Sequence, residues 1–561
     1  MNRKEYKSIS YKRTNKKTCS RRLAALAVFM AAAGLCACGS EAGAHSSEAP
    51  FLQPEQSGEV EGEEYEKEQE EGSMETSKET SRETNYGKLF QGITLAKGYK
   101  GIKDENPIMT QRFGADPYAM VYEDKVYFYM TADTPSYDAE DNLEENTYGN
   151  INTISVVSTE DMVNFTDHGQ IAAAGKDGAA KWAKNSWAPA AAWKIIDGKP
   201  KFFLYFADAG GGIGVLSADD PTGPFTDELG HGLITRDMPN CGNVLWLFDP
   251  AVLMDDDGRA YLYFGGGVPE DKISEPGTAR AVELGEDMMS ILGEPVVIDA
   301  PYLFEDSGIH KYKDKYYYTY CSNWQVDEAG TEKYGFHNAE IVCLESENPL
   351  GPFTFKEVIL KNPGQVFGLY GNNHHCVFCF KDQWYITYHT RLLEQQMGWE
   401  KGYRCTHVDE FTMGEDGSIG YIRQTYTGRR QLKPLDLYQE TGATTASVMA
   451  GVETASREEA GGMVLCGMHT GSYVKLEGVD FGEQAPEIIM ARLCSDGEGG
   501  VLRITIDTLN SEALAYLEVP ETTEGFVEVR AEFETEIVGV HDLYVTFYGQ
   551  GYEIGSWQLL K

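Results

Sequence analysis

One two-part unit recurs five times along this chain of 561 residues. Each copy is an apolar strand that begins at a polar or aromatic residue, a tight polar turn, and a second strand rich in aromatic residues. The copies cover 115–129, 186–206, 248–264, 301–320 and 373–388. They start roughly 55–75 residues apart, the length of a four-stranded β-sheet with its loops. The repeat predicts an all-β protein with a five-bladed β-propeller over residues 87–430.

A β-sandwich of ordinary hairpins is the alternative fold. A lone hairpin cannot bury both of its faces, whereas sheets stacked around an axis can, and the same order of polar residue and strand in every copy favours the propeller. The innermost strand of each blade begins near the central channel. The residues at these starts are therefore expected to meet there: Asp116, Trp187, Asp249, Glu305 and His374.

Three of those five residues are carboxylates, which are rarely buried without a partner or a function. Glycoside hydrolysis uses one carboxylic acid to protonate the leaving oxygen and a second carboxylate to activate water or attack the anomeric carbon. The acid must stay protonated at neutral pH, and burial beside another negative charge raises its pKa. The set therefore indicates a glycosidase. A lipoprotein that captures glycans without cleaving them is the alternative from another class.

The motifs around these residues resemble those of glycoside hydrolase family 43, over about residues 106–428. The resemblance is carried by RFGADP at 112–117, WAP at 187–189, LFDPA at 247–251 with DDDG at 255–258, FEDSGIHK at 304–311 and GNNHH at 371–375. It implies an inverting mechanism in which Asp116 is the general base and Glu305 the general acid. Asp249 would raise the pKa of Glu305 and orient it, and Asp306 is the rival acid. A retaining fructosidase is disfavoured because Asp116 lies in Ala-Asp-Pro-Tyr rather than in an Asn-Asp-Pro-Asn-Gly-like context.

The resemblance also suggests a substrate. The family includes α-L-arabinofuranosidases, β-xylosidases and endo-arabinanases, and the segments 148–153 and 185–189 are most similar to members that act on arabinoxylan. We therefore expect release of arabinofuranose side chains from this plant cell-wall polysaccharide, with β-xylosidase or endo-arabinanase activity as alternatives. Trp187 is expected to form a wall of the sugar subsite, and His375 and Arg391 are the other candidate substrate-binding residues.

No cofactor is implied for the chemistry, although many members of the family hold a calcium ion at the propeller centre through one imidazole. His374 or His375 would face that position, and His374 is the candidate ligand. A zinc site formed by both histidines with Cys376 and Cys379 is disfavoured, because alternate residues on a strand point in opposite directions. The net charge of −40 argues against nucleic acid or anionic lipid as a partner.

The first residues have the pattern of an export signal. A basic segment precedes an apolar run from Leu23 to Leu35, and the sequence LCACGS at 35–40 resembles a bacterial lipobox with Cys38 as the lipidated residue. Secretion with cleavage near Ala37 is the alternative. We expect a signal peptide at 1–38, a disordered acidic tether at 39–86, and a bacterial cell-surface lipoprotein that touches the membrane only through its lipid.

Residues 431–561 lack the repeat and resemble carbohydrate-binding module family 6, a β-sandwich of the jelly-roll type. The resemblance rests on the segments 469–476, 478–482 and 539–547. Glu553 stands where these modules have a sugar-binding Asn, so sugar binding and a structural role beside the propeller are both open. Tyr473 and Phe526 are the candidate stacking platforms.

Overall fold

The computed structural model describes residues 86–561. The predicted signal peptide, Cys38 and almost all of the acidic tether lie outside the described residues. Within 86–561 the chain is all-β apart from short helices, and none of those helices is both long and apolar enough to span a bilayer.

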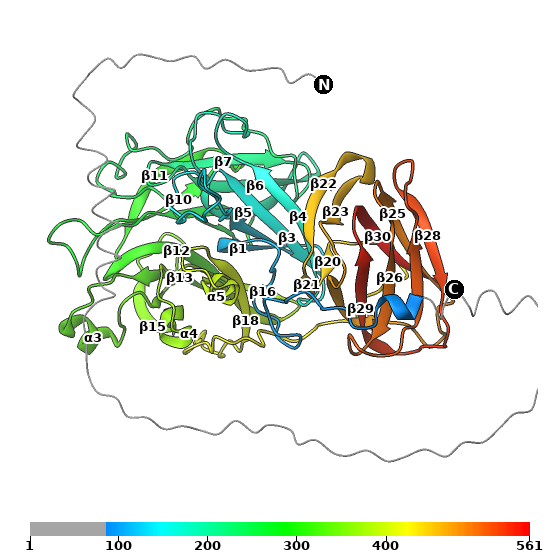
Figure 1. The fold of residues 1–561 in the computed structure, drawn as a ribbon. Coiled ribbons are helices and arrows are strands. Elements are labelled where there is room, and N and C mark those ends of the chain that lie inside the picture. Colours follow the sequence, from blue (N-terminus) through cyan, green and yellow to red (C-terminus); the bar gives the residue numbers. More distant parts are fainter. Residues whose placement is uncertain (1–85) are drawn as a thin grey trace, which may run out of the picture. The chain divides into compact units, whose positions relative to one another are not determined.

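Residues 115–411 form five antiparallel sheets that follow one another along the chain (Figure 1). The first contains β1 (Ala115–Tyr122), β2 (Lys125–Thr131), β3 (Thr153–Thr159) and β4 (Phe165–Ala172), and the second β5 (Trp187–Ile196), β6 (Lys199–Ala207) and β7 (Ile213–Ala218). The third contains β8 (Ala251–Met254), β9 (Ala260–Phe264), β10 (Ala279–Leu284) and β11 (Ile291–Ile298). The fourth contains β12 (Leu303–Tyr312), β13 (Lys315–Ser322), β14 (Ile341–Ser346) and β15 (Thr354–Leu360), and the fifth β16 (His375–Phe380), β17 (Gln383–Thr390) and β18 (Cys405–Phe411). Three short helices lie in the connections: α3 (Glu328–Tyr334), α4 (Pro363–Phe367) and α5 (Leu392–Met397).

The five sheets contact one another in a cycle. The first strand of each sheet touches the first strand of the next, from β1 to β5, β8, β12 and β16, and β16 touches β1 again. A separate hydrophobic cluster fills the space between each pair of neighbouring sheets. Each sheet thus buries both faces against its neighbours, as the sequence repeat requires.

The first strands share a local distortion at the end where the site residues lie. Asp116, Ala188, Asp249 and Asp306 all have positive φ, at 48°, 42°, 51° and 70°. The pairing register shifts beside this residue in β1, β5 and β12, as in a β-bulge. The residues equivalent to Asp116 and Asp249 are therefore Ala188 and Asp306. Trp187 and Glu305 each stand one residue earlier, so the equivalence expected from the sequence is wrong by one residue at these two positions.

Residues 441–560 form two further sheets that share one hydrophobic core. One contains β22 (Glu453–Arg457), β23 (Gly462–Cys466), β25 (Ile488–Ser495), β28 (Val527–Glu532) and β30 (Tyr552–Leu560), with β19 (Thr441–Gly442) at its side. The other contains β21 (Val448–Ala450), β24 (Tyr473–Asp480), β26 (Gly500–Ile506), β27 (Ala515–Val519) and β29 (Val540–Gly549). This region is a β-sandwich.

The segment that precedes the first sheet packs on the sandwich. The Tyr86 hydroxyl donates a hydrogen bond to Glu518 at 2.6 Å, and the Phe90 ring lies 6.0 Å from the Tyr516 ring. The backbone N–H of Ala96 donates to the carbonyl of Gly471 at 2.8 Å. From residue 86 the chain therefore runs first along the sandwich, then passes through the five sheets and returns to the sandwich.

The two regions are joined by a shared strand and by a buried ion pair. The two-residue strand β20 (Thr445–Ala446) pairs with β4 and so extends the first sheet. Asp167 on β4 is 2% exposed; it accepts a hydrogen bond from Arg112 at 2.7 Å and another from Thr454 on β22 at 2.7 Å.

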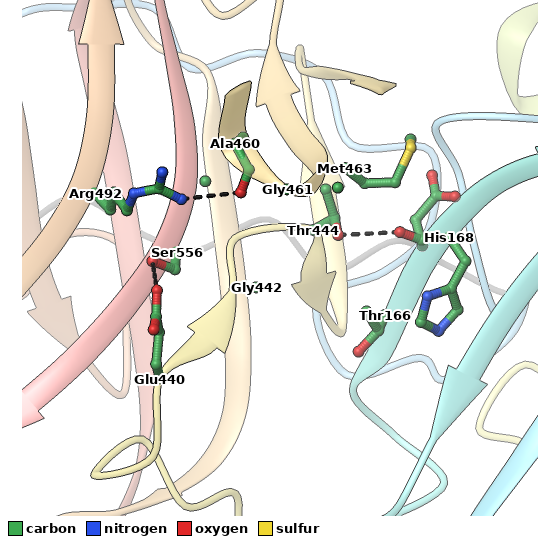
Figure 2. A pocket seen from close by; sticks show the side chains of 13 residues that line it. Thr166, His168, Glu440, Gly442, Thr444, Ala460, Gly461, Met463, Arg492 and Ser556 are labelled. Carbon is green, nitrogen blue, oxygen red and sulfur yellow. Dashed lines mark hydrogen bonds between the residues drawn. The ribbon is translucent and has the colours of Figure 1, made fainter. Parts of the chain in front are cut away.

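A pocket of about 270 Å³ lies at this junction, between β4 and the sandwich (Figure 2). Its polar groups bond to neighbours within the protein. Ser556 donates to Glu440 at 2.7 Å, Arg492 to the carbonyl of Ala460 at 2.9 Å, and Thr444 to the carbonyl of Asp167 at 3.1 Å. We interpret the pocket as part of the domain junction.

The Asp167 pair predicts a large stability effect. Asp167→Ala leaves the Arg112 guanidinium without its carboxylate, and should lower the free energy of unfolding by about 3 kcal/mol in chemical denaturation. The control is Glu528→Ala, which removes an ion pair to Arg530 whose two side chains are each 55% exposed and should leave stability nearly unchanged. Equal stability of the two variants would contradict this view of the junction.

Candidate active site

Three carboxylates from three sheets lie in one buried cluster, and two of them, Asp116 and Asp249, lie beside His374. Asp116 lies on β1, Asp249 just before β8 and Glu305 on β12, and they are 5%, 5% and 8% exposed. His374 Nδ1 lies 3.5 Å from Asp116 Oδ1 and 3.9 Å from Asp249 Oδ2. The backbone N–H of Asp306, the residue after Glu305, donates to Asp249 Oδ2 at 2.9 Å. The convergence expected from the repeat is therefore present.

Asp116 is held as a carboxylate. Arg404 Nη1 donates to its Oδ1 at 2.9 Å, and His389 Nδ1 lies 3.2 Å from the same oxygen. Burial raises the pKa of Asp116, but the charge of Arg404 and the contacts with His389 and His374 outweigh burial and hold it well below the usual value. A carboxylate of this kind can accept a proton at any pH near neutrality.

Glu305 has the opposite surroundings. Its Oε1 is buried and has no hydrogen-bond partner in the described structure. Burial raises the pKa of Glu305 well above its usual value, and the charges of Asp249, Asp306 and Asp116 raise it further. Burial raises the pKa of Asp249 as well. Because Asp249 accepts a backbone N–H whereas Glu305 Oε1 accepts nothing, a proton added to this pair is most stable on Glu305.

Asp306 belongs to a separate series of buried side chains that contact one another. Its Oδ2 lies 2.5 Å from His375 Nδ1, and its Oδ1 lies 3.3 Å from His374 Nε2. His375 Nε2 in turn lies 2.7 Å from the Thr319 hydroxyl oxygen. Both nitrogens of His375 are therefore occupied, and its side chain is 0% exposed. Contact of His375 with substrate therefore stays a prediction, and Asp306 is a poorer acid candidate than Glu305 because it is engaged with both histidines.

The charged groups around His374 are carboxylates. Its Nδ1 lies near Asp116 and Asp249 and its Nε2 near Asp306, and its role as a calcium ligand stays a prediction. Among residues 86–561 no three His, Cys, Asp or Glu side chains are arranged to hold a metal ion. In this conformation His374 links the carboxylates to one another.

Trp187 and Arg391 lie near the site but are engaged with the protein. Trp187 Nε1 donates to the carbonyl of Tyr148 at 3.0 Å, which fixes the 148–151 loop to the start of β5. Arg391 Nε donates to the buried Glu394 at 2.5 Å. Their contact with substrate remains a prediction.

Arg404, Asp133 and His389 also belong to the site, although no sequence motif points to them. Arg404 precedes β18 and His389 is on β17, and neither belongs to one of the motifs. Asp133 follows β2 in an Ala-Asp pair that recurs after β6 as Ala207-Asp208. That recurrence is a signal that could have identified Asp133 as a site residue.

On the far side of Glu305 the chain is closely packed. The rings of Phe248 and Phe304 each lie 5.3 Å from the Trp246 ring. A Cβ placed on Gly266 would lie 2.6 Å from the carbonyl oxygen of Phe304 and 2.7 Å from the Phe248 ring. Only glycine fits here, so Gly266 allows the segment that follows β9 to pass close to Phe304, the residue before Glu305.

Comparison with known proteins agrees with this geometry. Residues 105–419 match the model of glycosyl hydrolases family 43, and residues 442–561 match that of the carbohydrate binding module of family 6. The chain belongs to glycosyl hydrolase family 43.

Two relatives of this family 43 chain are named arabinoxylan arabinofuranohydrolase. The protein of Paenibacillus polymyxa is 44% identical over 81% of this chain and 74% of its own length, and that of Bacillus subtilis is 40% identical over 85% and 96%. A crystal structure of a family 43 arabinoxylan arabinofuranohydrolase from Bacillus subtilis, in complex with cellotetraose, has a TM-score of 0.79. It is 38% identical and covers 83% of this chain and 99% of that one.

In the family 6 region Glu553, which stands where these modules are expected to have a sugar-binding Asn, is held in an ion pair. Arg457 donates to both oxygens of Glu553, at 2.8 and 2.5 Å. Tyr473 is 6% exposed, so the prediction that it is a stacking platform is wrong. Phe526 is partly exposed, with the Arg492 guanidinium 5.4 Å from its ring centre.

The packing at Gly266 predicts a test of how Glu305 is positioned. Gly266→Ala should displace the backbone before Glu305 and lower kcat on a glycoside substrate by about 10- to 100-fold. Gly462→Ala is the control, because a Cβ there meets nothing within 4 Å. Wild-type kcat in Gly266→Ala, measured beside this control, would show that the close approach is not required.

Proposed function

We propose that this family 43 chain is an inverting glycoside hydrolase that releases α-L-arabinofuranose from arabinoxylan. The observation that carries the proposal is the contrast between Asp116, kept ionised by Arg404, and Glu305, whose buried Oε1 has no partner. Inversion needs one base and one acid in fixed and opposite protonation states. The names of the relatives from Paenibacillus polymyxa and Bacillus subtilis support arabinoxylan as the substrate.

In the proposed mechanism Asp116 accepts a proton from water while the water oxygen bonds to the anomeric carbon. The glycosidic C–O bond breaks, and Glu305 gives its proton to the leaving xylan oxygen. Asp249 keeps Glu305 protonated and fixes the backbone of Asp306. At the end Asp116 is protonated and Glu305 is ionised, and proton exchange with solvent restores the starting state.

The pH dependence of this scheme follows from the signs of the two pKa shifts. Activity is lost as pH rises through the raised pKa of Glu305, because the acid then lacks its proton. It is lost on the acidic side only where Asp116 becomes protonated, well below the usual range of a carboxyl group. The profile should therefore have its main limb on the basic side.

We also propose that residues 87–430 are a five-bladed β-propeller and 431–561 a jelly-roll sandwich. The cyclic contacts of β1, β5, β8, β12 and β16 support the propeller. The lipobox-like sequence supports a signal peptide at 1–38, a lipid on Cys38, an acidic tether at 39–86 and a place on the bacterial cell surface. The proposed mechanism does not use a calcium ion at the propeller centre.

The first test is the sugar released. The purified protein should hydrolyse nitrophenyl α-L-arabinofuranoside much faster than nitrophenyl β-D-xyloside, and should release arabinose from arabinoxylan with inversion, followed by NMR. Xylose as the main product would make the chain a β-xylosidase, and oligosaccharides cut from arabinan would make it an endo-arabinanase. Retention of configuration would exclude the proposed scheme, and binding without any release of sugar would leave a capture protein.

Leaving groups separate the acid from the base. Glu305→Gln should lower kcat on arabinoxylan by roughly 10²–10⁴-fold, but should recover most activity on aryl arabinofuranosides whose acidic phenols leave without a proton. Asp116→Asn should be inactive on both substrates, because its defect lies in water activation. Equal recovery of the two variants would contradict the assigned roles.

A further inference from the structure

Asp133 lies directly behind the site, in none of the motifs, and is 0% exposed. It makes no hydrogen bond to Asp249 or Glu305. Its carboxylate instead takes three donors from a single residue: Arg404 donates through its backbone N–H at 3.0 Å and through Nε and Nη2, each at 2.9 Å. A buried carboxylate devoted to one arginine fixes the orientation of that guanidinium.

The remaining terminal nitrogen of Arg404 serves the base. With Nε and Nη2 on Asp133, Nη1 points to Asp116 Oδ1 at 2.9 Å. One face of the guanidinium lies over the Tyr148 ring, 4.6 Å from its centre. The carboxylates of Asp133 and Asp116 and the ring of Tyr148 together fix the position of the Arg404 guanidinium.

Asp133 also balances charge. Arg404 is the cation of the buried cluster, and its positive charge lowers the pKa of Asp116, Asp249 and Glu305. A second carboxylate on the same guanidinium offsets part of that charge. The titratable groups that face Arg404 or these acids are Asp116, Asp133, Tyr148, Asp249, Glu305, Asp306, Tyr318, Cys321, His374 and His389.

We propose that Asp133 is a positioning residue of the active site, which aims Arg404 Nη1 at the general base and limits the positive charge that reaches the general acid. The inference rests on the proposed hydrolase function. Asp133 touches neither water nor sugar in this scheme and acts only through Arg404.

The test is Asp133→Asn, which keeps the shape of the side chain but removes its charge and turns one acceptor into a donor facing Arg404. We expect kcat to fall about 10- to 100-fold with little change in KM, because Asp116 is displaced from its working position. We also expect the basic limb of the pH profile to move to lower pH, because the undiminished charge of Arg404 favours ionised Glu305.

Two further variants make the test specific. Asp133→Glu keeps the charge but moves it, so kcat should fall while the basic limb stays at the wild-type pH. Asp161→Asn is the matched control: Asp161 is 2% exposed and accepts the backbone N–H groups of Val163 and Asn164, remote from Arg404 in the hydrogen-bond network. It should lose stability but keep wild-type kcat and both limbs.

The outcomes separate this inference from the proposed function. A wild-type protein that hydrolyses no glycoside disproves the function. With an active wild type, the inference is overturned if folded Asp133→Asn keeps wild-type kcat, or if its kcat falls while the basic limb does not move. If Asp133→Asn is not recovered folded, Asp133→Glu decides: a displaced basic limb in that variant overturns the charge argument, and a wild-type kcat overturns the positioning argument.

Discussion

The site depends on how one buried guanidinium is shared among several buried carboxylates. Desolvation opposes the ionised form of every acid in the cluster, so each stays charged only where a donor or cation compensates. Arg404 compensates Asp116 and Asp133, a backbone N–H partly compensates Asp249, and Glu305 Oε1 receives nothing. An unequal distribution of donors thus shifts the pKa values of Asp116 and Glu305 in opposite directions, although both are ordinary carboxyl groups.

The backbone makes that distribution possible. Positive φ at Asp116, Asp249 and Asp306 interrupts regular pairing at the strand start and lets adjacent residues face the same centre. Aspartate adopts this conformation more readily than most residues, which explains its recurrence there. In β12 the distortion brings Glu305 toward the cluster while Asp306 turns to His375 beneath it. A regular strand would send two consecutive side chains to opposite faces.

These details mark the limit of sequence analysis for this chain. The repeat predicts five sheets and the meeting of Asp116, Asp249 and Glu305, because strand starts in a cyclic array share a location. It does not reveal the one-residue offset of Trp187 and Glu305, since a bulge changes register without changing the strand pattern. It also does not reveal Arg404 and Asp133. These residues lie just before β18 and just after β2, far apart in the sequence, and only the fold brings them into contact. Nor does the sequence reveal that both nitrogens of His375 contact other side chains, those of Asp306 and Thr319.

The sandwich region raises a different question, because its family resemblance and its contacts point to different roles. Glu553, at the position expected for a sugar-binding Asn, is paired with Arg457, and Tyr473 is buried against the segment that precedes the first sheet. The same region supplies β20, which covers the outer edge of β4, and Thr454, which completes the bonding of Asp167. An uncovered edge strand invites pairing with another chain, so covering it stabilises the first sheet and protects it. That sheet also carries Asp116 and Asp133, so the contacts of the sandwich favour a structural role in addition to any affinity for polysaccharide.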